Sequence, residues 1–185
     1  MNLSELGIRA KQASVLLAKM NVETKNRALI ACADALINER KSILEANAKD
    51  VLAGREKGMN EGLIDRLMLT EERIKGIADG LEQVAALNDP VGEVLEMKKR
   101  PNGLLIGRKR VPLGVVGMIY EARPNVTPDA FALCFKSGNA VILRGGSDAI
   151  NSNIAIVKVL RDTLKACGIT EDAIQLIEDT SHELG

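Results

Sequence analysis

The sequence is short of aromatic residues and carries no excess charge of either sign. Of its 185 residues only Tyr120, Phe131 and Phe135 are aromatic, and 25 basic residues balance 25 acidic ones to give a net charge of zero. Proteins that bind nucleic acids need positive charge for the phosphates and, for single strands, aromatic rings on which bases stack. We therefore expect no nucleic-acid partner.

Cysteine, histidine and long apolar runs are equally scarce. Cys32, Cys134 and Cys167 are odd in number and widely spaced, which indicates neither a disulfide framework nor a metal site. No run of apolar residues is long enough to span a membrane, and the charged amino terminus is unlike a signal peptide. We expect a cytoplasmic protein without membrane contact, in which the single histidine, His182, is a surface residue.

Residues 1–90 have the periodicity of amphipathic helices. Apolar residues recur every three or four positions, and charged residues fill the positions between them. We expect Thr24 to cap one of these helices and the stretch Thr70-Glu71-Glu72 to open another, with acidic residues in its first turn. Two short helices are expected to span 47–57 and 60–68. The region is interpreted as scaffold, because charged stripes on such helices usually face solvent.

Residues 93–111 predict a β-hairpin. Two extended segments, 93–99 and 103–111, are joined by a Pro-Asn-Gly turn, and basic residues lie on both of them. Two interpretations stay open. The ribbon is either an exposed one whose charges prevent edge pairing, or one that packs against a partner subunit.

From residue 112 to residue 185 apolar strands alternate with helices. The apolar runs, which predict buried strands, span 114–119, 140–143 and 174–177. The helices between them are expected over 128–137, with Thr127 as the cap, and over 148–166. This alternation predicts a parallel sheet and therefore an α/β fold.

In a parallel sheet the loops 120–127 and 144–147 leave the strands at the same carboxyl edge, where open α/β sheets bind ligands. The fold therefore predicts a crevice at this edge, lined by Glu121, Arg123, Asn125, Arg144 and Ser147.

Each of these loops allows a chemical and a plain structural interpretation. The Asn125 amide can donate to an oxyanion, or Asn125 is an ordinary turn residue. The segment Arg144-Gly145-Gly146-Ser147 either brings backbone N–H groups and an arginine to an anion or forms a tight turn. The common loops GxGxxG and GxxxxGK[ST] are absent. Cys134 lies in a wholly apolar run and is expected to be a core thiol rather than a nucleophile.

Residues 108–153 carry a more specific signal. The stretches VPLGVVGMIYEARPNVTPD and SGNAVILRGG closely resemble the gamma-glutamyl phosphate reductase family, which is also called glutamate-5-semialdehyde dehydrogenase. The family is part of the aldehyde dehydrogenase superfamily. Upstream stretches such as NAKDVLAGREKGM resemble it too, so the resemblance covers essentially the whole chain.

The resemblance implies an aldehyde-dehydrogenase-like α/β fold with amino-terminal helices, a β-hairpin and an incomplete Rossmann-like parallel sheet. It also implies the second step of proline biosynthesis, in which NADPH reduces gamma-glutamyl phosphate to glutamate 5-semialdehyde and phosphate. In the family a cysteine attacks the acyl phosphate and forms a thioester that accepts the hydride.

Several residues take roles from this resemblance. Asn125 matches the superfamily asparagine that donates to the oxyanion. Arg144, followed by Gly145 and Gly146, stands where relatives carry a lysine that contacts the adenine ribose. Ser147 replaces a glutamate found in NAD-preferring relatives, which favours NADPH because a glutamate would repel a 2′-phosphate. Arg123 is a candidate for binding a carboxylate or phosphate of the substrate.

The family is more than twice as long as this chain. We therefore expect the catalytic cysteine to lie outside residues 1–185, the chain alone to be inactive, and the 93–111 hairpin to support a homo-oligomer. Two alternatives are a non-catalytic fragment that binds nucleotide or a partner subunit, and another acyl-reducing member of the same superfamily. The latter is expected to match GMIYEARPNVTPD less closely.

Overall fold

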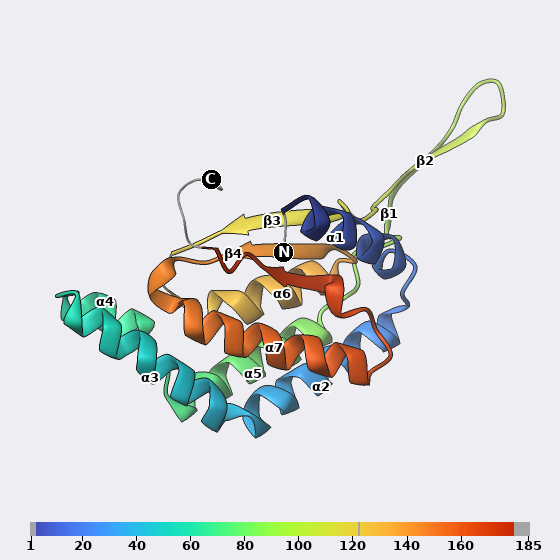
Figure 1. The fold of residues 1–185 in the computed structure, drawn as a ribbon. Helices are drawn as coiled ribbons and strands as arrows, with labels where there is room; N and C mark the ends of the chain where they lie inside the picture. Colours follow the sequence, from blue (N-terminus) through green and yellow to red (C-terminus); the bar gives the residue numbers. More distant parts are fainter. Residues whose placement is uncertain (1–2, 122, 180–185) are drawn as a thin grey trace.

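The computed structural model describes residues 3–121 and 123–179. Helices α1 to α5 come first, followed by a two-stranded ribbon and then by a parallel sheet with its crossover helices (Figure 1). The first five helices span Leu3–Leu17 (α1), Val22–Asn38 (α2), Arg40–Glu56 (α3), Glu61–Leu67 (α4) and Glu71–Ala86 (α5).

The ends of these helices follow local capping chemistry. Helix α5 opens at the expected stretch, and Thr70 caps it, with its hydroxyl accepting from the Arg73 N–H at 3.1 Å. Thr24 does not cap α2, because Asn21 lies three residues earlier and its side chain accepts from the Thr24 N–H at 2.8 Å. The helix expected over 47–57 starts earlier, at Arg40, directly after α2.

The hairpin consists of β1 (Val94–Lys99) and β2 (Leu105–Lys109), which pair antiparallel. It projects away from the rest of the molecule (Figure 1). Gly103 at its turn has a φ of 87°, a left-handed conformation that glycine adopts without steric cost.

The sheet has the order β3-β4-β5, and all of its strands are parallel. The strands are β3 (Val115–Ile119), β4 (Ala140–Arg144) and β5 (Ile174–Leu176). They are connected through α6 (Val126–Lys136) and through the short turn η1 (Ser147–Ala149) with α7 (Ile150–Ala166). Helices α6 and α7 cover one face of the sheet, and α2, α3 and α5 form a further layer behind them (Figure 1). The expected α/β fold class is confirmed.

Two details of this region differ from the sequence expectation. The strand β3 is only half-buried, and Ile119 is 80% exposed, because β3 is the edge strand of the described sheet. Helix α6 begins at Val126 rather than at Pro128, so Thr127 lies inside the helix and does not cap it. Its hydroxyl instead forms buried hydrogen bonds with Tyr120 and Asn153.

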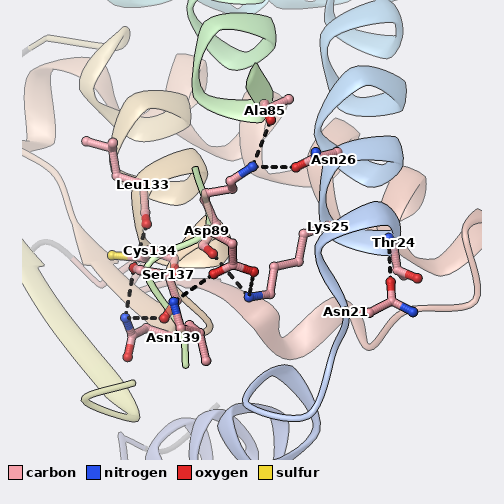
Figure 2. Close-up of polar contacts among 12 residues, drawn as sticks. Asn21, Thr24, Lys25, Asn26, Ala85, Asp89, Leu133, Cys134, Ser137 and Asn139 are labelled. Carbon is pink, nitrogen blue, oxygen red and sulfur yellow. Dashed lines mark hydrogen bonds and ion pairs between the residues drawn. The ribbon is translucent and has the colours of Figure 1, made fainter. Parts of the chain in front are cut away.

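Two buried lysines join the helices to the start of the hairpin. Lys25 on α2 is 1% exposed and forms an ion pair of 2.7 Å with Asp89, as Figure 2 shows. It also donates to the backbone oxygen of Lys136 on α6 at 3.2 Å. The Lys136 ammonium in turn donates to the Ala85 oxygen at 2.7 Å and to Asn26. These bonds fix α2, α5 and α6 relative to one another.

We expect Asp89→Asn to destabilise the protein by about 3 kcal/mol, because it leaves the Lys25 ammonium buried without a counter-charge. Urea unfolding measures this change. Asp162→Asn, which breaks the exposed pair with Lys158, is the control and is expected to change stability little. Equal stability of the two variants would show that the buried pair does not hold the helices together.

Candidate active site

The two candidate loops meet at the carboxyl edge of the sheet. Strands β3 and β4 are parallel neighbours, and the Tyr120 N–H donates to the Arg144 oxygen at 3.1 Å. The segment after β3 therefore starts beside the segment after β4, as the alternation of strands and helices predicts.

The residues of these loops do not all face the same space. Arg123 and Asn125 open onto a cleft of about 440 Å³ between the start of α6 and the corner of α4 and α5. Glu121, Arg144 and Ser147 do not line this cleft. Its lining residues are Asp65, Arg66, Met68, Leu69, Arg73, Gly76, Ile77, Arg123, Asn125 and Asp129.

Asn125 stands at the N-cap position of α6 and interacts with the Asp129 side chain one turn later. Loss of water within the cleft raises the pKa of Asp129, and the neighbouring Asn125 amide works in the opposite direction. Asn125 thus places an amide that can donate at the cleft, next to the Asp129 carboxylate.

A buried hydrogen-bond network lies behind the two loops. The Tyr120 hydroxyl and the Thr127 hydroxyl are 2.6 Å apart, and Thr127 donates to the Asn153 side-chain oxygen at 2.8 Å. Thr127 and Asn153 are both 0% exposed. Burial raises the pKa of Tyr120. The network ties α6, which begins next to Asn125, to α7, which follows the loop 144–147.

The Gly145 backbone fits closely against this network. A Cβ at position 145 would overlap the Asn153 side-chain nitrogen and lie 3.1 Å from the Tyr120 hydroxyl. Among the described residues that nitrogen has no hydrogen-bond partner. Only glycine therefore allows the loop backbone to pack this closely against the network.

Asp50 on α3 holds the start of α7. Its carboxylate accepts from the Ser152 N–H at 2.7 Å and from the Asn151 side chain at 2.7 Å. Asp148 in the turn η1 pairs with Lys57 at 3.1 Å, which offsets negative charge beside Ser147. The loop 144–147 is therefore held from behind by α3.

Sequence reasoning did not identify Tyr120, Asp129 and Asn153 as parts of the site. An aspartate in the first turn of a helix is explained by the helix dipole, so Asp129 carried no separate signal. Tyr120 and Asn153 are brought together with Thr127 only by tertiary packing.

The cysteines do not supply a nucleophile to the cleft. Cys32 and Cys134 are buried, and none of the three lines the cleft. Burial raises the pKa of Cys32 to about 12 and also raises that of Cys134. Thiols of this kind are inert, because the thiolate is the reactive form.

Three further expectations concern features outside this cleft. Within residues 3–121 and 123–179 no group of three or more metal-binding side chains is present. His182 lies outside the described residues. Among the helices described, none is both long enough and apolar enough to cross a membrane.

The fold is that of the aldehyde dehydrogenase class of α/β enzymes. An acetylating aldehyde dehydrogenase from Geobacillus thermoglucosidasius superposes with a TM-score of 0.71 at 16% identity, covering 97% of this chain and 37% of that one. At this identity the likeness concerns the fold alone. No protein-family model matches the sequence.

Within that class the chain is similar over its whole length to the amino-terminal part of gamma-glutamyl phosphate reductases. It is 58% identical to the enzyme of Lachnospira eligens, with 99% of this chain and 44% of the relative aligned. The crystal structure of the Thermotoga maritima enzyme superposes with a TM-score of 0.96 at 45% identity, covering 100% of this chain and 44% of that one. These relatives are oxidoreductases, and the chain spans less than half of their length.

We expect Gly145→Ala to destabilise the protein by about 1–3 kcal/mol, because Asn153 is buried and bonded to Thr127 and cannot move away from an added methyl group. Urea unfolding again provides the measurement. In the control Gly7→Ala the new methyl group meets open space on α1, so stability is expected to stay the same or rise. If Gly145→Ala were as stable as this control, the loop would have room for a side chain.

Proposed function

We propose that this chain is the amino-terminal, cofactor-side part of a cytoplasmic enzyme that reduces L-gamma-glutamyl 5-phosphate with NADPH. The products are L-glutamate 5-semialdehyde and phosphate, in the second step of proline biosynthesis from glutamate. The observation that carries this proposal is the 58% identity over 99% of the chain to a gamma-glutamyl phosphate reductase. The amide of Asn125 at a charged cleft agrees with such chemistry.

The loop after β4 suits a dinucleotide. Within the part of the chain that the structure describes, the N–H groups of Gly146 and Ser147 make no hydrogen bond, so they are available to an anionic group. Arg144 would bind the adenine ribose and its 2′-phosphate, next to the uncharged Ser147. The cofactor, when bound, supplies the hydride.

In this proposal Asn125 stabilises the negative charge that develops on the carbonyl oxygen of the substrate. Arg123, on the same loop, binds a phosphoryl or carboxylate group of the substrate. The nucleophilic cysteine comes from the part of the enzyme outside this chain, which agrees with the buried, inert thiols described above. The chain alone is then inactive.

The ribbon of β1 and β2 is proposed as the contact between subunits of a homo-oligomer. It carries several exposed apolar side chains on both strands and at its turn, and it stands clear of the rest of the molecule (Figure 1). Apolar surface on a projecting ribbon is typical of an interaction site. These side chains are Val94, Leu95, Met97, Leu104, Leu105 and Ile106.

In a full-length reductase that carries this sequence, Asn125→Ala is expected to lower kcat by ~10²–10³ with little change in NADPH affinity. Steady-state kinetics and NADPH titration measure the two quantities separately. Asn38→Ala, at an exposed position on α2 away from the cleft, is the control. An unchanged kcat for Asn125→Ala would remove this residue from the mechanism.

Arg144→Ala in the same enzyme is expected to weaken NADPH binding more than NADH binding, because only NADPH carries the 2′-phosphate. Dissociation constants for both cofactors, measured by fluorescence titration, test this. Equal weakening of both would contradict a role of Arg144 at the 2′-phosphate.

A further inference from the structure

The cleft beside Asn125 contains more charged side chains than the roles above use. Two of them neutralise one another, since Arg73 pairs with Asp65 at 2.8 Å. Arg73 also donates to the Met68 oxygen at 2.7 Å. This pair closes the corner between α4 and α5 and forms a wall of the cleft.

Three charged side chains of the cleft remain open to a ligand. Arg66 and Arg123 make no side-chain hydrogen bond or ion pair within the described part of the chain. Asp129 lies next to the Asn125 amide, and a carboxylate has more acceptor sites than one amide could fill. The cleft thus offers one negative and two positive charges.

The proposed substrate has complementary groups. At one end, gamma-glutamyl phosphate carries an acyl phosphate, and at the other it carries an ammonium and a carboxylate on one carbon. Three carbon–carbon bonds separate the reacting carbonyl carbon from this α-carbon, a distance of about 4 Å. Asn125 and Asp129 are four residues apart in the sequence, at the start of α6. Residues with this spacing on a helix have their Cβ atoms about 5–6 Å apart.

This inference rests on the proposed function. We propose that the cleft binds the amino-acid end of gamma-glutamyl phosphate, with the Asp129 carboxylate accepting the α-ammonium group and Arg66 binding the α-carboxylate. Asn125 then lies one helical turn away, next to the carbonyl oxygen. Arg123, which precedes Asn125 by two residues, is left for the phosphoryl group.

The surroundings of Asp129 agree with this role. Its carboxylate is reached by solvent but stands among the cleft walls, where loss of water raises its pKa. An ammonium group in the cleft would favour the ionised form of this carboxylate. Arg66, on α4, provides the opposite charge from another wall of the same cleft.

The test uses a full-length reductase with this sequence, assayed in the oxidative direction. An aldehyde, inorganic phosphate and NADP⁺ then give an acyl phosphate and NADPH, whose absorbance is followed. Two aldehydes are compared, glutamate 5-semialdehyde and 5-oxopentanoate, which differ only in the α-amino group. The readout is the ratio of their kcat/KM values.

Asp129→Asn keeps the size of the side chain and one acceptor oxygen, but it removes the charge. We expect it to lower the preference for glutamate 5-semialdehyde by ~10- to 100-fold, since a charge-assisted hydrogen bond is lost. Activity on 5-oxopentanoate, which has no α-ammonium group, is expected to fall less than activity on glutamate 5-semialdehyde. Arg66→Gln is expected to raise KM for both aldehydes and to leave the ratio as it is.

Asp34→Asn makes the same chemical change on the exposed face of α2 and is the control. If Asp129→Asn lowers both activities equally, Asp129 only positions Asn125 and the inference is overturned, whereas the proposed function stands. If Asp129→Asn leaves both activities as they are in the unaltered enzyme, the inference is overturned as well. If the unaltered enzyme oxidises neither aldehyde, the proposed function itself fails.

Discussion

The parallel pairing of β3 with β4 is the constraint on which the rest of the site depends. Because parallel strands end at the same edge, the segment that follows Ile119 and the segment that follows Arg144 are placed side by side. Helix α6 must then cross back over the sheet, and its first residues, Asn125 among them, start at that edge. The cleft forms where the start of this helix meets the corner of α4 and α5.

Buried polar groups, rather than apolar contacts alone, define how the helices sit on the sheet. Lys25 and Asp89 join α2 to the segment before the hairpin, Asp50 joins α3 to α7, and Thr127 joins α6 to Asn153. An apolar core tolerates small shifts between helices, whereas a buried hydrogen bond is lost when its partners move apart. These networks therefore restrict the helices to one arrangement and hold the two candidate loops at a set distance.

The fold could be predicted from the sequence wherever interactions between residues close in the chain determine it. Alternation of short apolar runs with amphipathic helices indicates a parallel sheet, and the turn at Gly103 indicates the hairpin. The candidate site could be predicted only in part. The local sequence predicts that Thr127 caps a helix, whereas the structure shows that it bonds to Asn153. Asn153 is 26 residues further along the chain, so no local pattern connects the two residues. Arg66 and Asp129 lie on two helices that meet only after folding, so no spacing in the sequence connects them.

The carboxylate of Asp50 has a consequence for how this edge of the sheet can evolve. It occupies the N–H groups of Asn151 and Ser152, so an internal negative charge already offsets the positive end of the α7 dipole. An anion at the loop 144–147 would therefore be bound by the side chains and the backbone amides of the loop itself. Ligand preference at this edge is therefore encoded in residues that single substitutions can change, while the hydrogen bonds that hold the helix stay the same.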